Sequence, residues 1–247
     1  MAFEYRVGDI LELSCPYTEA RVTGLTADDV LVEWPWWAVD PASDGVRWNG
    51  VVAVAAGPDT PGWDREVFRI QPAAAELDAD SGEPATETMC RIGIPPTVVH
   101  VIAVRRFDPP RVTGWLPRPR REVVFLRAGQ SVDPGAEDQG AWFDPEDDIP
   151  RRVELRFRPY AFLEIGDEIA DAGGRAWRFG GPWTWQPFDG AGPDGPTWPL
   201  LLLTRDGDSD DAAAVDVTEA TLEGSHDEEL ARWRELARLS PEEPDDE

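Results

Sequence analysis

The stretch Val30–Ala56 reads VLVEWPWWAVDPASDGVRWNGVVAVAA and holds four of the twelve tryptophans of the chain. Apolar and polar residues alternate into and out of this stretch, which is typical of β-strands. Between the two ends, Asp40–Gly45 combines a proline that presets φ with a glycine that tolerates positive φ, so it predicts a turn. We therefore expect two extended segments that fold back on each other. The tryptophans near the bend would be Trp34, Trp36, Trp37 and Trp48.

Short runs with strand periodicity lie on both sides of this hairpin. The group in residues 1–71 resembles an SH3-like barrel in the spacing of its strands. Residues 72–88 hold five acidic residues and no arginine, so they predict an acidic linker or loop. Thr97–Phe107 is β-branched and apolar on both faces, and it predicts a central strand.

A second group of strands is expected within residues 89–224. Its Gly166-Asp167 strand start resembles Gly8-Asp9 near the N-terminus, and both groups continue into tryptophan- and proline-rich hairpins. The chain is therefore predicted to be mainly β. We expect two SH3-like, small-barrel-like groups of antiparallel strands with a central strand layer. If the resemblance extends beyond these few residues, the two groups are related halves of an internal repeat.

One α-helix is predicted, at residues 225–239. Ser225 and Glu228 form the S-x-x-E pattern of a capping box, and Leu230 and Trp233 begin an apolar stripe. Ser240-Pro241 ends the helix, and residues 240–247 form an acidic tail.

The net charge of −26 and the pI of about 4.3 disfavour binding to nucleic acid or to anionic membranes and favour a basic partner. All 23 basic residues are arginine, and the missing lysine excludes Schiff-base and P-loop chemistry. No segment resembles a signal peptide or a membrane span, so we expect a cytoplasmic protein with Cys15 and Cys90 reduced.

Five tryptophans are candidate protein-interface residues, because consecutive strand residues point to opposite faces and cannot all enter one core. They are Trp36, Trp37, Trp48, Trp183 and Trp185, of which the last two should share one face of a strand.

Histidine chemistry is not indicated by the spacing of the two histidines. His100 should be a packed core residue and His226 a solvated one. Asp206, Asp208 and Asp210 resemble the opening of an EF-hand loop and are weak metal candidates. Because Asp211 and Val217 replace the required glycine and glutamate, a hairpin turn is the simpler interpretation.

Three functions fit this sequence. The first is a non-enzymatic acidic protein, without cofactor, that binds a basic protein surface in an inhibitor-like, immunity-like or bridging role. The second is a carboxylate-based sugar-active enzyme or a glycan-binding module, with tryptophans that stack on sugars. The third is a structural subunit that self-associates into a homo-oligomeric assembly.

Overall fold

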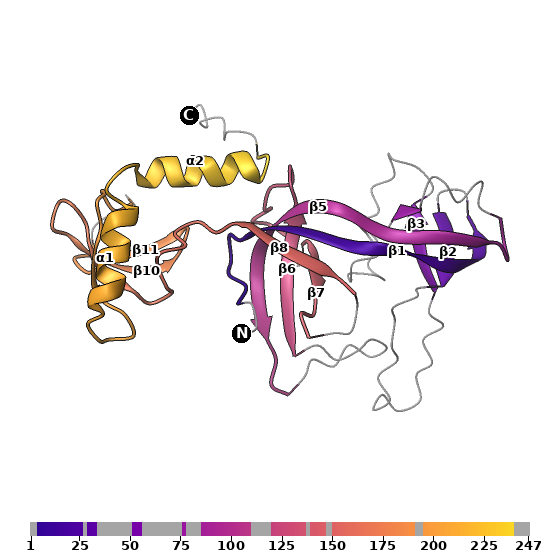
Figure 1. Cartoon of the computed structure of the whole chain (residues 1–247), viewed down its shortest axis with the longest axis horizontal. Coiled ribbons are helices and arrows are strands. Elements are labelled where there is room, and N and C mark those ends of the chain that lie inside the picture. The colour runs from indigo at the N-terminus through magenta and orange to yellow at the C-terminus, as the bar shows by residue number, and fades with distance from the viewer. Residues whose placement is uncertain are drawn as a thin grey trace. The chain divides into compact units, whose positions relative to one another are not determined.

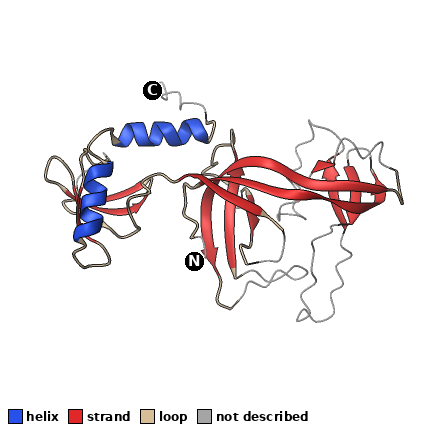
Figure 2. Ribbon diagram, viewed as in Figure 1, coloured by secondary structure: helices blue, strands red, loops and turns tan. Residues whose placement is uncertain are grey.

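The computed structural model describes residues 4–26, 29–33, 51–55, 76–77, 85–109, 120–136, 139–146, 150–190 and 195–239. These residues form twelve strands and two helices (Figures 1 and 2). The chain divides into two compact units. The first contains residues 1–6 and 11–156, and the second contains residues 7–10 and 157–247.

The first unit is built on one antiparallel sheet. The strands follow the spatial order β3-β2-β1-β5-β6-β7, with β4 beside β5 and β8 beside β1. Their bounds are β1 Ile10–Leu25, β2 Asp29–Glu33, β3 Val51–Ala55, β4 Glu76–Leu77, β5 Met89–Arg106, β6 Arg121–Arg127, β7 Ala141–Phe143 and β8 Arg152–Phe157.

The core of this unit follows the two-residue period of its strands. Alternate residues of β1, β5, β6 and β7 form one buried cluster. Its members are Leu11, Leu13, Val99, Val101, Val123, Phe125, Ala141 and Phe143. The predicted central strand is confirmed, because β5 lies between β1 and β6 and His100 is buried within it.

The hairpin expected at Val30–Ala56 is present in outline. β2 and β3 are antiparallel partners, with Val32 opposite Val52. The four tryptophans of the bend lie outside the described residues. The SH3-like grouping is not confirmed, since the described residues show two antiparallel sheets and no closed barrel. β1 runs for 16 residues and β5 for 18, each through a place where the sequence suggested separate short elements.

The predicted division at residues 71 and 88 does not coincide with the two units. β1, from the first predicted region, and β5, from the third, are neighbours in one sheet. The expected linker contains β4, and Glu87 and Thr88 exchange backbone hydrogen bonds with Val22 of β1.

The second unit combines a four-stranded antiparallel sheet with two helices. The strands are β9 Glu168–Ala170, β10 Ala176–Gly181, β11 Thr184–Pro187 and β12 Leu201–Thr204, in the order β11-β10-β9-β12. The helices are α1 Asp211–Ala220 and α2 His226–Leu236. The prediction of one helix was wrong, because α1 occupies part of the region predicted to be β.

Each helix begins at a side-chain cap. Ser225 accepts a hydrogen bond from the Glu228 backbone N–H, as the capping-box pattern predicted for α2. Asp210 caps α1 by accepting from the Ala213 N–H at 3.0 Å. This cap sets the start of a ten-residue helix whose valines and threonine have low helical preference, so packing must supply much of its stability.

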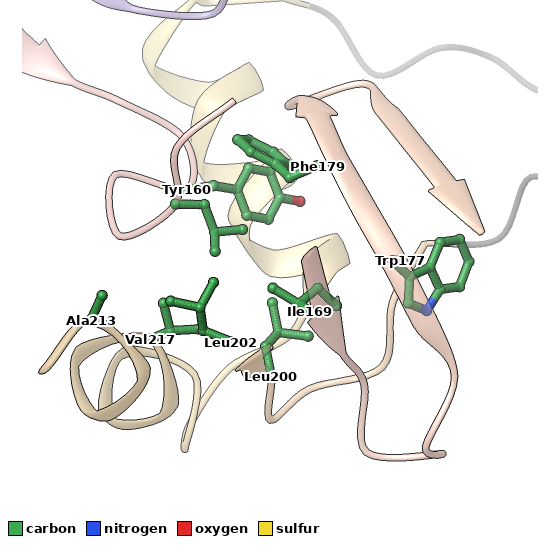
Figure 3. Close-up of a cluster of buried hydrophobic side chains, with 9 residues drawn as sticks. Tyr160, Ile169, Trp177, Phe179, Leu200, Leu202, Ala213 and Val217 are labelled. Atoms are coloured by element: carbon green, nitrogen blue, oxygen red, sulfur yellow. The ribbon is translucent and has the colours of Figure 1, made fainter. Parts of the chain in front are cut away.

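One face of the four-stranded sheet packs against α1. Ile169, Trp177 and Leu202 come from three neighbouring strands and belong to one buried cluster with Ala213 and Val217 of the helix (Figure 3). The remaining buried members of this cluster are Tyr160, Leu163, Phe179 and Leu200. Thr221, after α1, fixes the edge strand to the helix, because its hydroxyl accepts from the Leu200 N–H at 2.8 Å.

The two Gly-Asp pairs noted in the sequence have the same local structure within this unit. Gly8 and Gly166 both have positive φ, at 91° and 101°, and the aspartate that follows each is buried. Arg158 binds Asp9 through two nitrogens at 2.7 and 2.8 Å. Arg205 binds Asp167 in the same way, at 3.1 and 2.7 Å. The resemblance is therefore real at these two corners, and the larger internal repeat stays a prediction.

Candidate protein-interaction surface

The structure describes two of the five tryptophans predicted as interface residues. Trp36, Trp37 and Trp48 lie outside the described residues. Trp183 and Trp185 both belong to the β10–β11 hairpin, but they do not share a face. Gly181 pairs with Thr184, so Trp183 lies in a two-residue turn, and Trp185 lies on the strand. The prediction of a shared face failed because it assumed that the strand continued through residue 183.

Trp183 packs against the N-terminal segment of its own unit. Its side chain is 46% exposed, and its ring lies edge-on to that of Trp233 with centroids 4.6 Å apart. A Cβ on Gly8 would be 2.8 Å from the Trp183 ring, and the Trp233 indole N–H donates to the Gly8 carbonyl at 2.8 Å. Gly8 is therefore held between two indoles, and half of the Trp183 side chain remains available to solvent.

Trp185 belongs to an aromatic cluster centred on Tyr160. Its ring centroid lies 4.9 Å from that of Phe179 and 5.4 Å from that of Tyr160. Phe162 and Trp198 also contact Tyr160 edge-on. Trp185 is only partly buried, but most of its ring contributes to the core and not to an open surface.

His226 is not the solvated residue that the sequence suggested. It is half-buried, and its Nδ1 shares a 2.6 Å hydrogen bond with the Tyr160 hydroxyl. The Tyr160 backbone N–H donates to Glu229 of α2 at 2.9 Å. The first turn of α2 is thus fixed to the Tyr160 loop by two hydrogen bonds, a contact that the sequence pattern around His226 did not indicate.

The Tyr160–His226 pair is poorly suited to proton transfer near neutral pH. Burial raises the pKa of Tyr160, and the negative charges of Glu229 and Asp227 raise it further. Burial also lowers the pKa of His226, against an opposing effect of Asp227. Both side chains are therefore uncharged at pH 7, and the pair acts as a structural contact.

The weak metal candidates have structural roles in the chain. Asp206 and Gly207 occupy the centre of a hairpin turn, with φ of 53° and 86°, between the paired residues Arg205 and Asp208. Asp210 is the cap of α1. Within the described ranges, no group of three metal-ligating side chains is assembled. The hairpin interpretation of this segment accounts for the observed geometry.

The arginines of the sheet region are engaged in ion pairs within the unit. Arg158 binds Asp9, Arg175 binds Asp189, and Arg205 binds both Asp167 and Glu164. Because Asp9 and Asp167 are buried, two of these arginines neutralise carboxylates of the interior. The acidic residues of the unit far outnumber its arginines, so part of its negative charge has no arginine to compensate it.

That uncompensated charge is concentrated on the two helices and their connections. Residues 206–239 contain eleven acidic residues and three arginines. α1 carries Asp211, Asp216 and Glu219 and no basic residue, and all three carboxylates are exposed. The first turn of α2 adds Asp227, Glu228 and Glu229, where the helix dipole favours negative charge.

Exposed apolar side chains lie among these acids. Val215 of α1 is 56% exposed and Leu222, just after the helix, is 65% exposed. The sequence analysis missed this surface because it interpreted residues 206–211 as a hairpin turn or a weak metal site and the region up to residue 224 as β. The signal was present, since Asp210 followed by an alanine-rich segment is a helix start.

No family model, curated protein or solved structure matches this chain. Neither of the two described helices is long and apolar enough to cross a membrane.

Proposed function

We propose that this protein binds a basic protein partner through the acidic surface of its C-terminal unit. The observation that supports this most directly is α1, which exposes three carboxylates and carries no basic residue. Surface carboxylates without partners raise the local negative potential, which attracts and orients a positively charged protein during association.

The distribution of charge within the unit also supports the proposal. If the acids served only to stabilise the fold, we would expect their arginine partners beside them. Three arginines that flank the strands instead pair with Asp9, Asp167 and Asp189, while the carboxylates of α1 are left to solvent. A partner that supplies arginine or lysine would complete these pairs across an interface. An inhibitor-like or bridging role would use the same surface.

The test combines salt dependence with matched charge variants. The full chain is immobilised and exposed to a cell extract at about 0.05 M and about 1 M salt, where the screening length falls to about 3 Å. Captured proteins are identified and purified, and their affinities for the full chain are measured in isolation. We expect basic proteins that bind at low salt and dissociate at high salt.

The decisive variant replaces two acids of α1, Asp216→Asn with Glu219→Gln. Its control removes the same net charge from the first unit, Glu19→Gln with Glu154→Gln, at positions that are also exposed. The α1 variant should weaken binding several-fold and flatten its salt dependence, while the control should change both much less. Equal effects of the two variants would contradict a specific acidic surface, and binding that survives about 1 M salt would contradict an electrostatic one.

A further inference from the structure

The four-stranded sheet has a second face, opposite the one that packs on α1. Strand register defines which residues share this outer face. Ala176 lies opposite Ala170, and Ala170 lies opposite Leu201. The Phe188 N–H donates to the Ala176 carbonyl at 3.1 Å and continues the same row beyond β11. One row across the whole width of the sheet is therefore apolar.

This row is open to solvent at both ends. Phe188 is 60% exposed and Leu201 is 52% exposed. The solvent face of an antiparallel sheet is normally polar. The next row of this face follows that rule, with Gln186, Arg178, Glu168 and Thr204 in register. The apolar row is the exception, and contiguous exposed apolar surface marks sites of interaction.

The dimensions of the row suit a helix. Phe188 and Leu201 are separated by three strand spacings, about 14 Å, and only two alanines lie between them. An α-helix with its side chains is about 10–12 Å in diameter. A helix that ran along β9 and β10 would rest on the alanines, with a large apolar side chain on each flank.

The charges around this face indicate that a helix docked on it would be basic. Turns at the ends of the strands carry Asp171, Asp206 and Asp208. Arg178 is opposite Glu168 on the face itself, so these two charges offset each other. A second copy of this chain would bring its own net charge of −26 to the contact, which disfavours self-association. A basic helix avoids that repulsion.

We propose that the outer face of the four-stranded sheet, along the row Phe188-Ala176-Ala170-Leu201, is the docking surface for a basic amphipathic helix of a protein partner. This inference rests on the proposed function and adds the apolar contact to it. Because α1 packs on the opposite face of the sheet, its carboxylates attract this helix through the long-range field, and the outer face buries the apolar side chains of the helix. Charge attraction then sets the rate of association, and burial of apolar side chains on the row sets the rate of dissociation.

The probe is a pair of synthetic peptides of about 18 residues that contain only leucine, lysine and alanine. One places its leucines on one helical face, and the other has the same composition in scrambled order. Affinity for the full chain is measured by calorimetry. The variants are Phe188→Ser and Leu201→Ser, and the control is Val132→Ser, an apolar residue of similar exposure in the first unit.

The amphipathic peptide should bind at least about tenfold more tightly than the scrambled one. Each row variant should remove about tenfold in affinity, as expected when one large apolar side chain no longer becomes buried. Val132→Ser should leave the affinity within about twofold. Circular dichroism of each variant confirms that a loss of binding does not come from unfolding.

The proposal is overturned if both peptides bind equally, or if the row variants and the control have the same effect. It is also overturned if the full chain dimerises in sedimentation and Leu201→Ser abolishes the dimer, since the row would then bind a second copy. These results leave salt-dependent binding of basic proteins intact. If neither peptide binds at about 0.05 M salt and the extract yields no basic partner, the proposed function itself fails.

Discussion

The two faces of the four-stranded sheet carry alternate residues of the same strands, yet one face is buried and the other is open to solvent. The row Trp177-Ile169-Leu202 is buried, with each residue at most 5% exposed. The neighbouring row Ala176-Ala170-Leu201 lies on the opposite face, and Leu201 is half-exposed. Both rows are apolar, but the buried row has the larger side chains, and the outer face also carries Arg178 and Glu168. The helices complete the difference, because α1 packs on the buried row.

The sharpest test of this difference replaces one aromatic residue on each face. Trp177→Ala should lower the free energy of unfolding by about 4 kcal/mol, because it opens a cavity and removes the indole N–H bond to Asp171. Phe188→Ala, on the outer face, should change stability by less than about 0.5 kcal/mol. Urea denaturation of both variants checks this, and similar losses would show that the outer face is also part of the stable core.

The buried ion pair at the start of β9 gives the next largest effect. Asp167→Asn should cost about 3 kcal/mol, because it leaves the mostly buried Arg205 without its carboxylate. Asp206→Asn in the neighbouring turn serves as the control and should be nearly neutral, since Asp206 is exposed. If thermal denaturation shows the same small change for both variants, the ion pair formed by Asp167 at the Gly-Asp turn does not determine the position of β9.

A smaller loss is expected at the aromatic cluster that extends the buried face. Tyr160→Phe keeps the ring contacts and removes only the hydroxyl that is bonded to His226. It should cost about 1 kcal/mol, the net value of one such hydrogen bond. Chemical denaturation measures the loss, and NMR titration should show that the pKa of His226 has changed. An unchanged His226 titration would mean that the hydroxyl contributes little to that site.

The smallest effect is a pH dependence. Burial lowers the pKa of His226 below its ordinary value of about 6.5, so the unfolded state binds this proton more readily. The contribution of neutral His226 is complete above about pH 6.5 and decreases as the pH falls. His226→Gln should therefore make stability less dependent on pH between about 6.5 and 5. Burial lowers the pKa of His100 to about 4, and this histidine should contribute in the same direction in both proteins.

Several features of the fold could be predicted from local sequence. The β-branched run Thr97–Phe107, apolar on both faces, identified β5, and the Ser225–Glu228 pattern identified the start of α2. Gly8-Asp9 and Gly166-Asp167 were recognised as similar strand starts because glycine and aspartate at a turn have few alternatives. Each of these signals is local, and each reports a backbone conformation that a few neighbouring residues determine.

Other features required contacts between distant residues. The length of β1 depends on pairing with β2 and β5, which no turn signal within residues 10–25 reveals. Trp183 was assigned to a strand because its partner Trp233 is 50 residues away in sequence. His226 was assigned to solvent because its partner Tyr160 is 66 residues away. The place of α1 in the core also depends on distant contacts, because Ala213 and Val217 belong to the same buried cluster as Leu202 of β12.

The sequence by itself determined the β character of this protein, its strong negative charge and the positions of its sharpest turns and of α2. These properties follow from composition and from interactions within a few residues. The tertiary structure alone decided which element covers the buried row of the sheet, which aspartates are neutralised by arginine and which carboxylates remain exposed. The physical reason is that burial and ion pairing depend on what lies across the fold, and a strand with apolar residues on both faces does not specify which face its neighbours will cover.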